Sequence, residues 1–196
     1  MPILDPSIDL EQPSRFTIEE IVNLMPLHYR KNLEFKNNIA GILRKYNFLN
    51  TPASTHNYSG DSNRIFEGSL AAHSVQVYKL LKQYTELGIV KWDRSISPFL
   101  VGILHDICKA YLYRKNNVGV WEHRPDAVFT GHGDLSLIIL GLEEFALTTQ
   151  ETLCIRWHMG AYEKDHWKEY DQAIRQCPAI LAVNMADMIA AKVMNK

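Results

Sequence analysis

The residues of this chain that are best suited to chemistry are histidines and aspartates spaced about one helix apart. Eight of the 196 residues are histidine, which is the commonest metal ligand in proteins. The recurring set, in chain order, is His73, His105, Asp106, His132, His158 and Asp187. Four imidazoles and two carboxylates suit one or two divalent ions, such as Mn, Fe, Ni, Zn or Mg. The spacing therefore predicts a metal site to which several helices contribute.

Four members of this set fall where buried helix faces are expected. His73 lies inside an apolar stripe at helical spacing, and Asp187 lies inside another such stripe near the end of the chain. Residues 99–104 are almost wholly apolar, so we expect a helix that is buried all round and that also contains His105 and Asp106. Because an ionisable group is costly to bury alone, these positions favour a compensating metal ion.

The other two members, His132 and His158, lie near predicted helix ends. His132 stands between two glycines, where the backbone can approach a ligand closely. Taken singly, a buried histidine or aspartate is more often a hydrogen-bonded structural residue than a metal ligand. The metal prediction therefore rests on the whole set, and above all on the adjacent pair His105 and Asp106.

Helices must position these side chains, and the chain carries the signals for an all-α domain with one small hairpin. Capping boxes are predicted at Thr17 with Glu20 and at Thr148 with Glu151, and further helix caps at Ser69, Ser97 and Asp134. The expected helices cover residues 17–30, 35–48, 69–88, 98–110, 134–145, 148–160 and 178 onward. A hairpin is expected over 111–115 and 118–123, and a long loop over 50–68.

The composition excludes several classes of protein. The formal net charge of -1 provides no basic field for a long nucleic acid or a membrane surface. Three widely spaced cysteines predict neither a disulfide framework nor a zinc knuckle. The first 15 residues carry acids and prolines instead of the basic start and apolar run of a signal peptide, and no transmembrane segment is predicted. We therefore expect a cytoplasmic protein.

At the His and Asp positions the sequence resembles the HD-domain superfamily, which is named for its His-Asp pair. The likeness covers residues 51–192 and is strongest to small bacterial and phage HD-domain hydrolases. It rests on TPAST (51–55), EGSLAAHS (67–74), ILHDICKAYLY (103–113), GHGDLS (131–136), IRWHMGAY (155–162) and LAVNMADMIAAK (181–192). The pattern also looks like the HD domain of certain bacterial 3'-5' exoribonucleases, without the oligonucleotide-binding barrel that those enzymes carry upstream.

This resemblance implies an HD-domain helical bundle over 51–196, with residues 1–50 as an N-terminal extension of two helices packed on it. It implies phosphoester hydrolysis by water activated on a metal ion. Carried over to this sequence, one metal ion would be held by His73, His105, Asp106 and Asp187. Asp106 would bridge to a second ion completed by His132 and His158.

The expected substrate is a small phosphorylated molecule, and a nucleotide fits best. Lys109, one turn after His105, either faces the same pocket and holds a phosphate oxygen or extends from the end of its helix into solvent. On the first reading, Asp106 and Lys109 are the expected catalytic residues. Further substrate contacts are predicted for Arg64, Arg114, Arg124 and Tyr162. The sequence leaves the metal identity and any oligomeric state open.

Two other classes of function stay open at this point. HD-fold oxygenases with a mixed-valent di-iron centre resemble the same order of six ligands. A non-catalytic signalling or binding module that retains its metal is the third reading. Iron content with an EPR signal would favour the oxygenase, and absence of turnover with any metal would favour the binding module.

Overall fold

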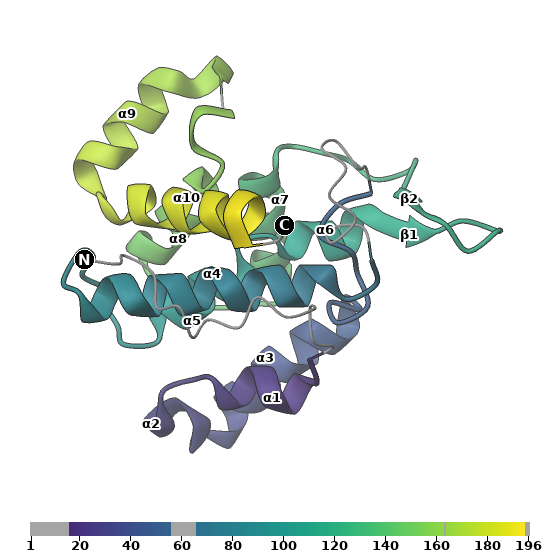
Figure 1. Cartoon of the computed structure of the whole chain (residues 1–196), viewed down its shortest axis with the longest axis horizontal. Coiled ribbons are helices and arrows are strands. Elements are labelled where there is room, and N and C mark those ends of the chain that lie inside the picture. The colour runs from purple at the N-terminus through teal and green to yellow at the C-terminus, as the bar shows by residue number, and fades with distance from the viewer. Residues whose placement is uncertain (1–15, 56–65, 163, 195–196) are drawn as a thin grey trace.

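The computed structural model describes residues 16–55, 66–162 and 164–194 of the chain (Figure 1). These residues form an all-α fold with one small two-stranded antiparallel hairpin, which confirms the expected fold class. One buried hydrophobic cluster takes in residues from the first helix through the last turn near the C-terminus. Arg64, a predicted substrate contact, and the middle of the loop predicted over 50–68 lie outside the described residues.

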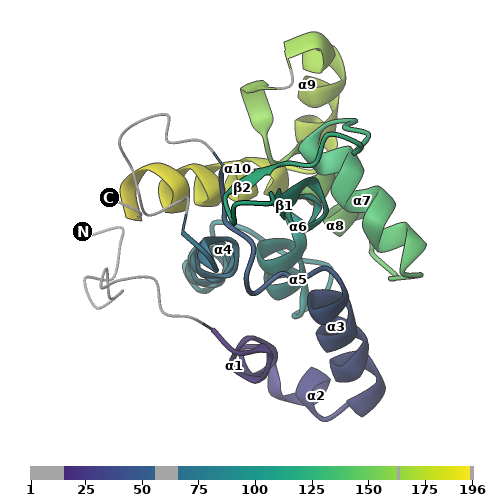
Figure 2. The same cartoon turned by 90° about the vertical axis from the view of Figure 1, so that its right-hand side faces the viewer.

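The N-terminal helices lie together on one side of the molecule (Figure 2). They are α1 (Ile18–Asn23), α2 (Leu27–Arg30) and α3 (Leu33–Lys45). The capping box of Thr17 and Glu20 is confirmed, with both reciprocal hydrogen bonds present. The single helix expected over 17–30 is wrong, because Pro26 lacks an N–H and separates α1 from α2.

The long helix α4 (Ser69–Glu86) and the short helix α5 (Ser97–Leu104) run side by side through the centre (Figures 1 and 2). Every residue of α5 is buried, as the apolar run over 99–104 predicts. Gly102 permits this close packing, since a Cβ at this position would lie 2.6 Å from the Cα of Tyr78. His73 lies on α4, and His105 directly follows α5, so the packing of these two helices fixes the positions of both histidines.

The helix caps predicted at Ser69 and Ser97 are wrong. The residue that caps α4 is Gly68, with φ of +90°, and the hydroxyl of Ser69 instead accepts a hydrogen bond of 2.7 Å from Ala53 N–H. Ser97 is already inside α5, and its hydroxyl donates to Glu151 over 2.6 Å. Both hydroxyls make hydrogen bonds to distant segments, which local capping rules do not include.

The helix expected over 98–110 is broken at the His-Asp pair. Asp106 has φ of −110° and ψ of 20°, and α6 (Ile107–Leu112) starts immediately after it. Ser136 holds this break by donating a hydrogen bond of 2.7 Å to His105 C=O and accepting one of 3.3 Å from Cys108 N–H. The break turns the Asp106 side chain away from the direction that a continuous helix would give it.

The hairpin consists of β1 (Tyr113–Lys115) and β2 (Trp121–His123), in the register Tyr113 with His123 and Lys115 with Trp121. Both strands are shorter than predicted, since α6 takes in residues 111 and 112 before β1, and the turn takes in residues 118–120 before β2. The Asn116 carboxamide closes the turn by accepting hydrogen bonds from Val118 N–H and Val120 N–H, at 3.1 and 2.9 Å. The hairpin projects from the helical body (Figure 1).

The C-terminal half is built from α7 (His132–Leu142), α8 (Thr149–Trp157), α9 (Trp167–Gln176), α10 (Ala179–Ile189) and a π-helical turn, Ala190–Met194. The capping box of Thr148 and Glu151 is confirmed. The sequence reading missed α9 altogether. The cap predicted at Asp134 is wrong, because Gly131 precedes the first residue of α7 and Asp134 forms an ion pair with Arg156.

Gly133 allows α7 and α8 to pack closely against each other. A Cβ at Gly133 would lie 2.1 Å from the carbonyl oxygen of Arg156, so α7 and α8 meet at this glycine. The sequence predicted that a ligand approaches the backbone beside His132, and in the structure α8 makes the close approach there.

Among the described residues no single helix is long and apolar enough to cross a membrane, although α9 and Ala179–Met194, a pair bent by 113°, meet those two criteria when taken together.

Candidate metal centre

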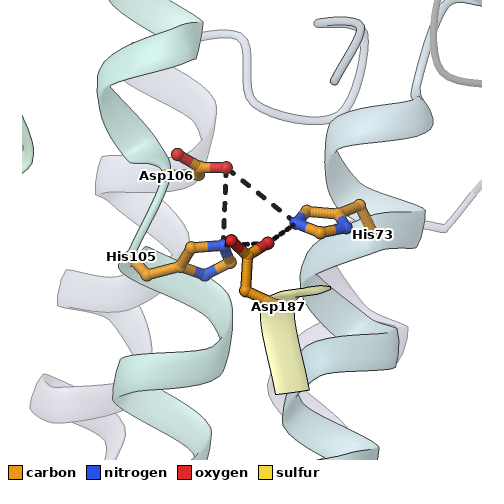
Figure 3. Close-up of side chains that lie close together, drawn as sticks. All are labelled: His73, His105, Asp106 and Asp187. Atoms are coloured by element: carbon orange, nitrogen blue, oxygen red, sulfur yellow. Dashed lines mark ion pairs between the residues drawn. The ribbon is translucent and has the colours of Figure 1, made fainter. Parts of the chain in front are cut away.

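Four of the predicted ligands meet where α4, the break between α5 and α6, and α10 come together (Figure 3). One ligand atom from each of His73, His105, Asp106 and Asp187 lies within 4.8 Å of the others. Nε2 of His73 is 3.0 Å from Asp187 Oδ1 and 3.9 Å from Asp106 Oδ2. Nε2 of His105 is 3.4 Å from the same Asp106 oxygen. The structure thus brings together residues that are up to 114 positions apart in the chain.

The polar atoms of this cluster are buried, and several have no hydrogen-bond partner among the described residues. His73, His105 and His158 are 0% exposed and Asp106 is 1% exposed. The unpartnered atoms are Nε2 of each of these three histidines, Nδ1 of His73 and Oδ1 of Asp106. Buried polar atoms without partners are rare because their desolvation is not compensated. A cation between Asp106 Oδ2, His73 and His105 would compensate two of the Nε2 atoms, and a cation beside Asp106 Oδ1 would compensate that oxygen and His158 Nε2.

Backbone carbonyl groups fix the rings of two of the histidines. Nδ1–H of His105 donates to Gly102 C=O over 3.0 Å, and Nδ1–H of His158 donates to Ile155 C=O over 2.7 Å. Each hydrogen bond places the proton on Nδ1 and leaves the Nε2 lone pair directed into the cluster. This arrangement is typical of histidines that ligate metal ions.

The two oxygens of Asp106 face different groups of residues. Oδ2 lies toward His73 and His105, whereas Oδ1 lies 3.5 Å from Nε2 of His158 and 4.0 Å from Nδ1 of His132. The sequence reading missed Cys108, whose thiol is 3.3 Å from the same His132 nitrogen. Its only signal was its position two residues after Asp106. Asp106, Cys108 and His132 also form a group close enough to hold a metal ion.

The protonation states suit metal binding at most of these positions. Burial lowers the pKa of His73, and it lowers the pKa of His132 to about 4, so both imidazoles are neutral at pH 7. Burial by itself would raise the pKa of Asp106, but the Lys109 ammonium and the His105 ring together hold it well below its usual range. His158 is the exception. Burial would lower its pKa, but the neighbouring Asp106 carboxylate raises it.

The Asp187 carboxyl is also held in its ionised form. Burial would raise its pKa, and the contact with His73 and the nearby His105 ring together lower it. The cluster therefore presents ionised carboxylates and imidazole nitrogens to one point, which is the donor set that borderline divalent ions prefer.

Lys109 lies in direct contact with the cluster. Its ammonium is 2.5 Å from Asp106 Oδ2, and the residue is only 7% exposed. Burial alone would lower the pKa of Lys109, but the Asp106 charge raises it. A pocket of about 410 Å³ opens from this point and is lined by Asp106, Lys109, His132, Tyr162 and Asp187. The predicted catalytic pair, Asp106 and Lys109, and Tyr162 therefore share one pocket with two further predicted metal ligands, His132 and Asp187.

The other predicted substrate contacts lie elsewhere. Arg114 and Arg124 line a neighbouring pocket between α3, α6 and the hairpin, and neither lines the pocket of the His-Asp cluster. His123, at the end of β2, also lines the cluster pocket.

Comparisons of the chain with protein-family models, with curated proteins and with solved structures found no match. The HD-domain resemblance therefore stays a prediction that rests on the motifs in this sequence. The geometry of the cluster is independent of that resemblance, because it follows from atomic positions alone.

Proposed function

We propose that this protein is a cytoplasmic, metal-dependent phosphohydrolase of the HD-domain type that acts on a nucleotide or a related small phosphoester. One observation carries the proposal. Imidazole nitrogens from α4, α5 and the C-terminal end of α8 are buried without hydrogen-bond partners around the two oxygens of Asp106. In this proposal His73, His105, Asp106 and Asp187 hold one divalent ion.

A second ion would share Asp106 with His132 and His158. The support for it is the division of the Asp106 oxygens between two groups of histidines. A bound divalent ion supplies an acidified water as nucleophile and neutralises charge on the phosphate oxygens. The chain's own contribution is to hold the ligands in fixed orientation through the carbonyl groups of Gly102 and Ile155.

The access to the cluster favours a catalytic site over a structural one. Structural metal sites are closed by protein ligands, whereas catalytic sites keep a position open to substrate. Here the His132 side chain is 22% exposed and Tyr162 is 63% exposed, both beside a pocket that ends at Asp106. The Lys109 ammonium is placed to receive a phosphate oxygen in exchange for its contact with Asp106.

The proposal is tested by element analysis of the purified protein, followed by assays with a panel of nucleotides, cyclic diesters and short oligonucleotides. We expect one or two bound divalent ions per chain and release of phosphate from at least one small substrate. Protein that binds no divalent metal under any loading condition would overturn the proposal. Redox-active iron with oxygen consumption and no hydrolysis would replace it with the oxygenase.

A further inference from the structure

A second pocket lies beside the candidate metal centre. It has a volume of about 670 Å³, within the usual range for small-molecule sites, and is enclosed by the end of α3, by α6 and by the hairpin. Tyr113 lines both this pocket and the pocket of the His-Asp cluster. None of the six residues predicted to bind metal lines the second pocket. It is therefore a neighbouring site with its own chemistry.

Aromatic side chains form much of its wall. Tyr46, Tyr111 and Trp121 are each partly buried against the hydrophobic core and line the pocket. Trp121 is held from one side by the ammonium of Lys115, which lies 5.4 Å from the ring centroid. Fixed aromatic surfaces of this kind favour a flat ring, which can stack on them at little cost in side-chain entropy.

The pocket is also positively charged. Four cationic residues and one acidic residue, Glu67, line it. Three of the cations have acidic partners: Lys45 with Glu143 at 2.6 Å, Lys115 with Glu67 at 2.7 Å and Arg114 with Glu122 at 3.0 Å.

Arg124 is the fourth cation, and it differs from the other three. Its guanidinium lies 5.2 Å from the centroid of the Tyr111 ring, and its Nε atom is buried without a hydrogen-bond partner among the described residues. No acidic partner for it occurs within the described ranges either. A buried N–H without an acceptor is costly, and an anionic group on a ligand would supply the acceptor.

We propose that this pocket binds a planar aromatic ligand that carries an anionic group, as in a nucleoside monophosphate, and that it does so without metal. The ring stacks on Trp121, and the anion accepts hydrogen bonds from Arg124. The site does not depend on hydrolysis at the His-Asp cluster, so it stands whether or not that cluster is catalytic.

Titration calorimetry of chelator-treated protein with adenosine 5′-monophosphate tests the proposal. We expect one binding event per chain, at least about tenfold weaker in Arg124→Gln because one charged hydrogen bond is lost. Adenosine, which has the ring without the anion, and ribose 5-phosphate, which has the anion without the ring, are each expected to bind more weakly than the nucleotide.

Two further variants keep the result interpretable. Trp121→Ala removes the stacking surface without changing charge and is expected to weaken binding, whereas Arg175→Gln removes an exposed guanidinium on α9 and should leave it unchanged. Asp106→Ala should also bind the nucleotide as the parent does. Absence of nucleotide binding, or binding that needs Asp106 but not Arg124, would overturn the proposal.

Discussion

Two buried charged clusters in this protein differ in how their polar atoms are satisfied. In the first, the Glu151 carboxylate is 0% exposed and accepts hydrogen bonds from Arg94 Nε at 3.1 Å, Ser97 Oγ at 2.6 Å and Thr148 N–H at 2.8 Å. A second Arg94 nitrogen, Nη2, also contacts it. No Glu151 oxygen is left without a partner among the described residues.

In the second cluster, around Asp106, three histidine Nε2 atoms and one carboxylate oxygen have no hydrogen-bond partner among the described residues. Both clusters are buried and both contain a carboxylate, so burial of charge does not separate them. The two clusters differ in how many buried polar atoms lack a hydrogen-bond partner. Such atoms around Asp106 predict a bound ligand, whereas the fully hydrogen-bonded atoms around Glu151 indicate a structural network.

Replacing the central carboxylate of the unsatisfied cluster should have the largest effect on function. Asp106→Ala is expected to lose bound metal and to lower any hydrolytic activity by at least about 100-fold, since even the outer partners of metal ligands are worth about 10 to 100-fold. Element analysis and a phosphate-release assay measure both quantities. If the variant kept its metal and its activity, Asp106 could not be a metal ligand.

The matched change in the satisfied cluster should act on stability. Glu151→Ala leaves Arg94 and Ser97 without their shared acceptor, and we expect the free energy of unfolding to fall by about 3 kcal/mol. Urea denaturation followed by circular dichroism measures the change. The folded variant should hold as much metal per chain as the parent. Loss of metal from it would contradict the inference that the Glu151 cluster is structural and that only the Asp106 cluster binds metal.

Adding metal should stabilise the protein through the unsatisfied cluster alone. At a free metal concentration of 100 times Kd, the unfolding free energy should rise by about 2.7 kcal/mol, because the ion binds the folded state. Thermal denaturation with and without the ion measures this rise. We expect it to persist in Glu151→Ala and to vanish in Asp106→Ala, and an equal rise in both variants would show that the ion binds elsewhere.

Acidification should destabilise the metal-free protein through His132, by a smaller amount. Its pKa in the folded state is lowered from 6.5 to about 4, so the unfolded chain takes up the proton first as the pH falls. The unfolding free energy should therefore decline between pH 6.5 and pH 4, by about 2.5 kcal/mol from this residue.

His132→Gln should lose less stability than the parent over the same pH interval. Comparing the two proteins isolates this residue from His158, whose raised pKa acts in the opposite direction. Urea denaturation at several pH values provides the measurement. Parallel pH profiles for the parent and the variant would mean that His132 keeps its ordinary pKa.

Local patterns in the sequence predicted the elements that carry the cluster. Helical spacing placed His73 and Asp187 on inward faces, and the structure has both in the cluster. The capping box of Thr148 and Glu151 was also predictable, because its hydrogen bonds join residues three positions apart. Such signals work because each depends on atoms within one helical turn.

The same locality explains the errors. Glu151 was expected only as a capping residue, and its contact with Arg94 spans 57 positions of the chain. The break at Asp106 was missed because it is held by Ser136, which lies 30 residues later. Amphipathic α9 was missed although Tyr170 and Ala173 bury one of its faces, since it starts without a capping side chain.

The sequence by itself determined an all-α fold and the inward positions of His73 and Asp187, since both follow from helical periodicity. Only the tertiary structure decided that the two oxygens of Asp106 face different histidines, and that Arg124 lies in a separate pocket from the cluster. The physical reason is that these distances depend on how helices distant in the chain pack together, and periodicity within one helix carries no information on that packing.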